Sequence, residues 1–218
     1  MSRYVVVDLE MCRVSKDMRK KFNVKQEIIQ IGAVLLDEDY KVIDKFSSYV
    51  KPSFGKIDPF IQKLTGISND NIKDASDIQT VLGKFFRWLP YDAVPVSWSN
   101  SDRKQLLSET FEKNLVIPDL EDVAEVWTDC QKEFGEKLDS RKCYSLEEAL
   151  VATDIITEGQ AHDGLVDAYN TALLFSKIRT EEEFKLNPYY ETAHNDSEAE
   201  ALTFSMGDLF TGLNLAVG

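Results

Sequence analysis

Apolar positions in the first fifty residues predict three strands. Residues 5–10 read Val-Val-Val-Asp-Leu-Glu, and such a β-branched apolar run is typical of a central strand covered on both faces. Residues 27–36 form a longer apolar run, and residues 41–50 alternate well enough for a third strand. Short connections between neighbouring strands predict an antiparallel start to the sheet.

Helical spacing and capping residues predict the elements that follow. Asp58 followed by Pro59 is typical of a helix start, and this short helix is expected to end at residues 65–67. A stronger helix is predicted from Ser76, its expected N-cap, to Leu89, because apolar residues recur there at helical spacing. Further helices are predicted from Asp102 to Lys113, through Gln131–Phe134, from a capping box at Ser145, and after His162 to about Ile178.

Two shorter apolar runs complete the predicted sheet. Residues 94–98 are expected to form a strand, and residues 123–126 a short edge strand. Antiparallel strands followed by strands that alternate with helices indicate an α/β fold, a mixed sheet with helices on both faces. We expect this fold to occupy residues 1–180 as one domain.

The segment after residue 180 has a different character. Residues 181–218 contain eight acidic residues and one basic residue, so we expect an acidic tail. Its final part holds an apolar cluster, formed by Leu202, Phe204, Met206, Leu209, Phe210, Leu213 and Leu215. We expect this cluster to dock on the body of the same chain, because an intrachain contact has the higher effective concentration. Binding to a protein partner or to a second copy of the chain is the alternative.

The composition indicates a folded protein without a membrane span. Hydrophobic residues make up 43% and charged residues 29% of the 218 residues, which favours a packed core over disorder. No apolar run approaches the roughly 18 residues of a membrane span, and the first residues do not resemble a signal peptide. The odd number of cysteines, three, indicates a reducing compartment, most simply the cytoplasm.

The net charge of −13 at first disfavours a nucleic-acid partner, but much of that charge belongs to the tail. Beside the first strand the chain is basic, because residues 13–25 contain six basic residues and a single acid. Such a run is usually a solvated loop. Its place next to two acidic strand positions predicts instead that it contacts phosphates, above all through Arg19, Lys20 and Lys21.

The first strand carries the first candidate for chemistry. Side chains alternate along a strand, so Asp8 and Glu10 point to the same face. Two carboxylates this close repel each other in a dry site. A divalent cation such as Mg²⁺ would remove the repulsion, because hard ions favour carboxylate oxygens. The alternative is a strand end at which both side chains reach solvent.

Two later acidic positions and a histidine extend this candidate site. Asp102 lies at the start of a predicted helix, and Asp167 lies within the last one. His162 precedes Asp167 by five positions, which is about 140° around a regular helix. One helix would therefore not point both side chains at one atom. We expect His162 on the loop before the helix and Asp163 at the N-cap.

Together these motifs resemble those of the DEDDh 3′–5′ exonucleases, whose fold is related to ribonuclease H. The motifs are Asp8-Leu9-Glu10, Asp102 before a helix, and His162 to Asp167, and the resemblance covers residues 3–180. Residues 8–12, 27–29 and 64–67 are further similar to the ERI-1-like branch and to bacterial sporulation-inhibitor-type exonucleases. The sequence departs from the pattern of this family at two places. Residues 97–102 read Ser-Trp-Ser-Asn-Ser-Asp where many relatives have His-Asn-Ala before Phe-Asp, and Gly164 stands where alanine is common.

The resemblance implies a ribonuclease H-like fold and a two-metal mechanism. Asp8, Glu10, Asp102 and Asp167 are expected to hold two Mg²⁺ or Mn²⁺ ions. His162 is expected to take the proton of the attacking water as general base. The reaction would release nucleoside 5′-monophosphates from the 3′ end of a nucleic acid, single-stranded RNA or a short 3′ overhang being favoured over DNA.

The resemblance also suggests which residues contact the substrate. Met11, Leu64, Thr65 and Ile67 are expected to hold the terminal nucleotide, as apolar side chains do for splayed bases. Ordinary core packing is the alternative for these four residues. Two other functions stay open for the whole chain: a DNA-directed 3′–5′ exonuclease of the proofreading type, and a regulatory interaction module built on an exonuclease fold.

Overall fold

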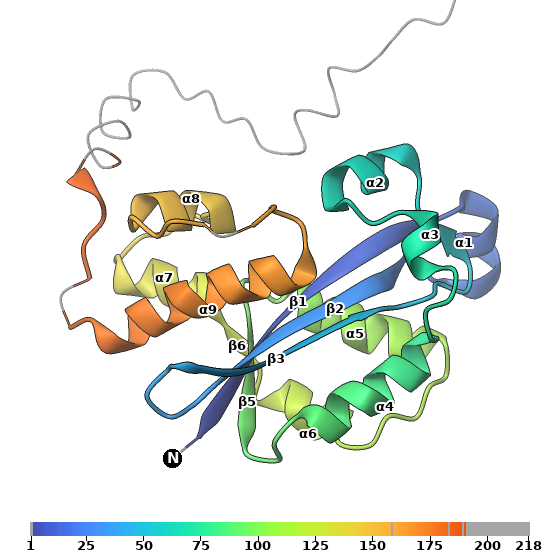
Figure 1. Cartoon of the computed structure of the whole chain (residues 1–218), viewed down its shortest axis with the longest axis horizontal. Coiled ribbons are helices and arrows are strands. Elements are labelled where there is room, and N and C mark those ends of the chain that lie inside the picture. Colours follow the sequence, from blue (N-terminus) through green and yellow to red (C-terminus); the bar gives the residue numbers. More distant parts are fainter. Residues whose placement is uncertain (1, 158, 183, 189, 191–218) are drawn as a thin grey trace, which may run out of the picture.

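The structure is a computed structural model that describes residues 2–157, 159–182, 184–188 and 190. In this part of the chain six strands form one mixed sheet in the order β3-β2-β1-β5-β6, with β4 paired to β1 (Figure 1). The antiparallel strands are β1 (Arg3–Val14), β2 (Gln26–Leu36), β3 (Val42–Tyr49) and β4 (Gly55–Lys56). Two strands pair in parallel, β5 (Ala93–Ser97) with β1 and β6 (Thr128–Asp129) with β5. The predicted mixed sheet with an antiparallel start is confirmed.

Helices cover both faces of this sheet (Figure 1). One face is covered by α4 (Ile78–Trp88), α5 (Ser101–Glu112) and α6 (Leu120–Glu125), the other by α7 (Cys130–Lys137), α8 (Leu146–Ala152) and α9 (Gly164–Thr180). Val5, Val7 and Leu9 of β1 pack into the first core, whereas Val6 packs into the second. Alternate side chains of β1 therefore face different layers, which explains why the strand is apolar on both sides.

Three short helices lie where β1 ends and β2 begins (Figure 1). They are α1 (Lys16–Phe22), α2 (Pro59–Thr65) and α3 (Asn69–Ile72). The predicted N-cap of α2 is confirmed, because the Asp58 side chain accepts the Ile61 N–H at 2.9 Å. The basic loop predicted over residues 13–25 is wrong in part. β1 continues to Val14, and α1 then begins after its cap Ser15.

Two further predictions about element boundaries are wrong. The N-cap of α4 is Asp77 rather than Ser76, because the Asp77 carboxylate accepts the Thr80 N–H at 2.8 Å. Residues 123–126 are not an edge strand. They belong largely to α6, whose buried Leu120 and Ala124 are one helical turn apart, and the edge strand is β6. A short apolar run fits either element, and packing against β5 decides between them.

A buried ion network joins β2, the loop at residues 53–55 and α5. The Lys113 Nζ lies 2.6 Å from Glu27 Oε1 and 2.7 Å from Glu109 Oε1. Glu27 also accepts the N–H groups of Ser53 at 2.8 Å and Phe54 at 2.7 Å. Burial alone would raise the pKa of Glu27, but the ion pair with Lys113 and these N–H groups lower it. The network therefore fastens a loop to the beginning of β2 and to the end of α5.

Replacing Lys113 with methionine is expected to lower the free energy of unfolding by about 3–5 kcal/mol, because two buried carboxylates lose their counter-ion. Urea denaturation of the variant measures this change. A second substitution, Glu109→Gln, should restore part of the stability by removing one of the two charges. Lys104→Met, at an exposed position of the same helix, should change stability by less than about 0.5 kcal/mol. An unchanged denaturation midpoint for Lys113→Met would contradict the role of the network.

The start of the predicted tail lies against the body. Phe184 and Phe134 pack edge to face with ring centres 5.7 Å apart, and the Lys142 Nζ donates to the Tyr190 hydroxyl at 3.0 Å. The apolar cluster of residues 202–215 lies outside the described residues, so its docking stays a prediction. None of the helices in the described part of the chain is long and apolar enough to cross a membrane.

Candidate active site

β1 carries two acidic side chains at the centre of the sheet. Asp8 and Glu10 follow Val6 at alternate positions, so they lie on the face that α9 covers. The register pairs Asp8 with Gly32 and Glu10 with Gln30 of β2, and an irregularity in the register follows directly after Glu10. The strand thus holds both carboxylates on one face, as the two-residue period predicts.

The start of α9 brings the histidine and a third acid to this face. The Asp163 carboxylate caps α9 by accepting the N–H groups of Leu165 and Val166 at 3.0 and 3.2 Å. His162 precedes the cap in a left-handed conformation, φ 64°, and its N–H donates to Asp167 Oδ2 at 2.8 Å. The predicted loop position of His162 and the predicted cap are both confirmed.

Among the described residues, Glu10, His162 and Asp167 form a cluster of side chains that could hold a metal ion. One imidazole nitrogen and one oxygen of each carboxylate all lie within 4.8 Å of one another. Strand β1 supplies one carboxylate, α9 another and the loop before α9 the imidazole, so oxygen and nitrogen donors meet at one point. Such a set of oxygen and nitrogen donors is of the kind that can hold a divalent cation.

Asp102 joins the site from the opposite layer. It is the second residue of α5 and is 6% exposed. Its Oδ1 accepts the N–H of Leu9 at 3.1 Å, which fastens the carboxylate to β1 between Asp8 and Glu10. Ser101 donates to the other oxygen at 3.3 Å. The unusual sequence before Asp102 therefore still places this residue beside the first strand.

Burial raises the pKa values of all four carboxyl groups, and repulsion among them raises those of Asp8 and Glu10 further. The pKa of Asp8 is raised well above its ordinary value, first by burial and then by the charges of Asp102, Glu10 and Asp167. Burial and the charges of Asp167 and Asp102 raise the pKa of Glu10 to about 8. Burial raises the pKa of Asp102 to about 6, and it also raises that of Asp167. The site thus gathers more negative charge than this environment favours.

The four residues expected at the terminal nucleotide occupy different environments. Thr65 and Ile67 are buried; the Thr65 hydroxyl donates to the Ile61 carbonyl at 2.9 Å and accepts the Ile67 N–H at 3.1 Å. These contacts give both residues a structural role at the end of α2. Met11 and Leu64 are partly buried. A contact between any of the four and a substrate stays a prediction.

The three basic residues expected at the phosphates lie on α1. Arg19, Lys20 and Lys21 are exposed and occupy the last turn of that helix. The Arg19 Nε donates to the Val14 carbonyl at 2.6 Å, which ties the helix back to the end of β1. The basic side chains are thus presented by a helix anchored to the strand of Asp8 and Glu10. Their contact with phosphates is not tested by the structure.

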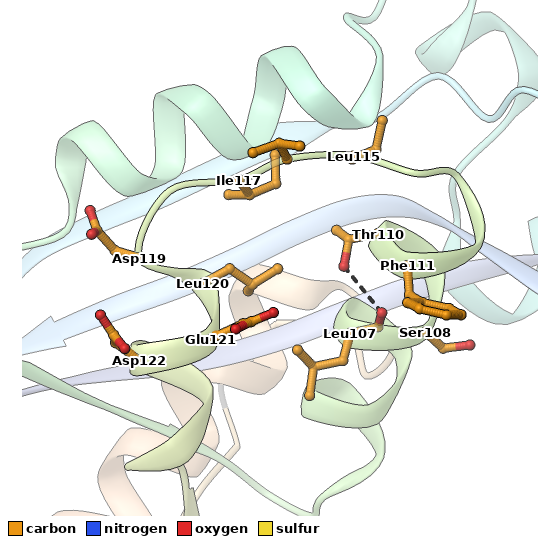
Figure 2. Close-up of a pocket in the computed structure, with 11 residues that line it drawn as sticks. Leu107, Ser108, Thr110, Phe111, Leu115, Ile117, Asp119, Leu120, Glu121 and Asp122 are labelled. Atoms are coloured by element: carbon orange, nitrogen blue, oxygen red, sulfur yellow. Dashed lines mark hydrogen bonds between the residues drawn. The ribbon is translucent and has the colours of Figure 1, made fainter.

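One cavity borders the candidate site, and a larger one lies elsewhere on the protein. A cavity of about 330 Å³ borders His162 and Asp167 and is otherwise lined by α8, the loop before α9, and Asn170. A larger cavity, about 760 Å³, lies between the C-terminal half of α5 and α6 (Figure 2). Figure 2 shows Leu107, Leu115 and Leu120 around that groove. None of the four acidic residues lines it, so size alone does not locate the candidate chemistry.

Comparison with known proteins gives the family. Residues 5–175 match the model of the exonuclease family RNase_T. This chain belongs to the exonuclease family. ERI1 exoribonuclease 2 of Danio rerio is 32% identical over 201 residues, which cover 81% of this chain and 35% of that protein. The chain therefore spans about a third of the length of that relative.

Two further comparisons show similarity to a DNA polymerase and to a solved nuclease domain. DNA polymerase III PolC-type of Caldanaerobacter subterraneus subsp. tengcongensis is 40% identical over 85 residues, or 39% of this chain and 5% of that protein. The solved nuclease domain of 3′hExo, a DEDDh family member bound to rAMP, has a TM-score of 0.71 at 24% identity. That match covers 85% of this chain and 96% of the other. The family match confirms that the chain is an exonuclease-family member, and this structural likeness confirms the ribonuclease H-like fold.

Sequence reasoning missed two residues that shape this site, Gln30 and Gly32. Gln30 is buried and its side chain reaches the first residue of α9. The backbone of Gly32 lies directly against the backbone of Gly164. The available signal was one glutamine and one glycine in the otherwise apolar run of residues 28–36. Such positions in a buried strand call for a partner or a close approach of another backbone.

Proposed function

We propose that this chain is a metal-dependent 3′–5′ exonuclease that releases nucleoside 5′-monophosphates from single-stranded RNA or short 3′ overhangs. The observation that carries the proposal is the convergence of Glu10, His162 and Asp167 within 4.8 Å, with Asp8 and Asp102 beside them. Membership of the exonuclease family supports it independently. A purely regulatory module would not require this combination of acids and histidine.

The four carboxylates fit a pair of divalent cations. Asp8, Glu10, Asp102 and Asp167 offer hard oxygen donors, which Mg²⁺ and Mn²⁺ prefer. Burial raises all four pKa values, and repulsion among the carboxylates raises those of Asp8 and Glu10 further; bound cations would relieve this repulsion. When bound, two divalent ions supply positive charge that stabilises the attacking and the leaving oxygen of a phosphodiester.

His162 is the proposed general base. A neutral imidazole accepts a proton from water, and His162 lies at the edge of the carboxylate cluster rather than inside the sheet. Its backbone N–H holds Asp167 at 2.8 Å, so the loop and the third acidic motif keep a defined relative position. In this arrangement Asp167 orients the histidine loop, and the imidazole removes the proton from the attacking water.

RNA is the proposed substrate, on the basis of similarity to ERI1 exoribonuclease 2. The local similarity to DNA polymerase III PolC-type makes DNA the second candidate. Matched 3′-labelled and 5′-labelled RNA and DNA oligonucleotides, incubated with Mg²⁺, Mn²⁺ or EDTA, distinguish them. We expect stepwise shortening of RNA from the 3′ end that EDTA abolishes. Faster shortening of DNA would reverse the substrate assignment, and full activity in EDTA would refute the metal requirement.

Substitution of Arg19, Lys20 and Lys21 by serine is expected to raise KM without a comparable loss of kcat. Fewer counterions would be released on binding, so log KM should depend less steeply on log salt, by about 0.7 for each lost phosphate contact. Steady-state kinetics between low and moderate salt measure this slope. A matched control replaces three exposed lysines elsewhere, namely Lys41, Lys132 and Lys137. Equal salt slopes for the triple variant and the wild type would show that α1 is only a solvated helix.

A cytoplasmic location and docking of the tail on the body of the same chain are the remaining parts of the proposal. Cys12, Cys130 and Cys143 are all free, and Cys143 is exposed, which supports a reducing compartment. The contacts of Phe184 and Tyr190 with the body favour docking of the following residues on the same chain. Binding of a partner or of a second copy by residues 202–215 is the alternative.

A further inference from the structure

A buried glutamine of β2 connects the sheet to the start of α9. Gln30 is 2% exposed and is paired with Glu10 in the β1–β2 register. Its Oε1 accepts the N–H of Gly164, the first residue of α9, at 3.0 Å. The two residues are 134 positions apart, so this hydrogen bond exists only when the helix rests on the strand.

The other amides of the first turn are satisfied locally. Asp163 accepts the N–H groups of Leu165 and Val166 through its side chain and that of Asp167 through its carbonyl, at 3.0, 3.2 and 2.9 Å. These bonds form wherever the helix lies relative to the sheet. The contact of Gln30 with Gly164 differs, because it specifies where the N-terminus of α9 sits.

The backbones approach very closely at this point. A Cβ atom added to Gly32 would lie 2.0 Å from the carbonyl carbon of Gly164, so glycine is required there. Gly32 follows Gln30 by two positions on the same face of β2. The glycine permits the close contact between β2 and α9, and the glutamine supplies its hydrogen bond.

The chemistry of the side chain matches this place. Ser47 of β3 accepts from the Gln30 Nε2 at 3.4 Å, which leaves the Oε1 facing the Gly164 N–H. An amide accepts this bond without charge. A carboxylate would add a further negative charge beside Glu10, where four acidic groups already repel one another.

We propose that Gln30 is a positioning residue of the active site: it sets the distance between Glu10 on the sheet and the His162–Asp167 pair at the start of α9. His162 and Asp167 are fastened to each other by the 2.8 Å hydrogen bond and move with the helix start. Loss of the Gln30 contact therefore widens the acidic cluster. The inference rests on the proposed function in one respect, that the cluster binds divalent cations.

The experiment compares Gln30→Leu, which removes the acceptor, with Gln30→Glu, which keeps an oxygen at the same reach. Mn²⁺ binding to the full chain is titrated calorimetrically, and hydrogen exchange of residues 162–167 is measured without metal. Gln30→Leu should weaken Mn²⁺ binding by about 10–100-fold, the usual effect of losing a group that orients metal ligands. It should also speed exchange at Gly164 and lower kcat with little change in KM for the oligonucleotide. Gln30→Glu should recover the protection of Gly164, because its side-chain oxygen can still accept the Gly164 N–H.

A core variant controls for a general loss of stability. Val81→Ala removes buried methyl groups from α4 in the other layer, so it should lower the melting temperature and leave Mn²⁺ affinity and kcat unchanged. Wild-type affinity and exchange in Gln30→Leu would overturn the proposal, and so would equal loss of Gly164 protection in Gln30→Leu and Gln30→Glu. A wild-type protein that binds Mn²⁺ without cleaving nucleic acid would refute the proposed function and leave this test intact.

Discussion

Glu10→Gln is expected to abolish nuclease turnover and to make the metal-free protein more stable at neutral and alkaline pH. Glu10 is 8% exposed, and burial with the charges of Asp167 and Asp102 raises its pKa to about 8. Glutamine has the same shape but cannot carry the charge. The substitution therefore removes a proposed metal ligand and, with it, the repulsion that the metal-free site contains.

The sign of the stability effect follows from the two pKa values. The ordinary pKa of a glutamate is 4.5, and that of folded Glu10 is about 8. Between these values the unfolded chain has lost the proton that the folded chain keeps. Stability contributed by Glu10 is complete below pH 4.5 and is lost as the pH rises toward 8. At pH 7 the metal-free wild type has thereby lost up to about 3 kcal/mol of its free energy of unfolding.

Thermal melting without metal at pH 4.5 and pH 8 measures this difference. Glu10→Gln should melt near the wild type at the lower pH and above it at the higher pH. Added Mg²⁺ or Mn²⁺ should raise the melting temperature of the wild type more than that of the variant. Glu125→Gln, an exposed position on α6, is the matched control and should show neither effect. Substantial turnover in Glu10→Gln would refute the assignment of this carboxylate to the metal site.

Removal of the His162 imidazole should lower kcat by about 10²–10⁴-fold, the usual contribution of a positioned general base. The residue has φ 64°, a conformation that alanine adopts with strain and asparagine tolerates. His162→Asn is therefore the better partner for His162→Ala, because it keeps the loop geometry without an imidazole. Both variants should still bind an oligonucleotide 3′ end with little change in affinity.

Metal titration shows whether His162 acts as the general base or as a metal ligand. The imidazole nitrogen lies within 4.8 Å of carboxylate oxygens of Glu10 and Asp167, so the two roles are geometrically close. If His162 is the base, His162→Asn should bind Mn²⁺ like the wild type and lose turnover. A near-normal kcat, or a large loss of Mn²⁺ affinity with turnover restored by excess metal, would contradict the assignment. Single-turnover kinetics at saturating metal measure the chemical step directly.

Local features of the sequence predicted a large part of the fold. The two-residue period of β1 placed Asp8 and Glu10 on one face, and the structure confirms that both lie under α9. Capping residues predicted the starts of α2 and α9, including Asp163, because an N-cap bond spans two or three residues. Helix α1 was not predicted, because its mostly exposed and basic residues do not show apolar side chains at helical spacing.

The sequence by itself therefore determined the main strands and longer helices, the three acidic motifs and the loop position of His162. Tertiary structure alone decided how these parts meet. Asp102 reaches the Leu9 amide across 93 residues, and Gln30 reaches Gly164 across 134. The physical reason is the distance along the sequence over which each kind of interaction acts. Periodicity and capping depend on neighbours within a turn, whereas the distance between a strand and a helix depends on how both pack against the same core.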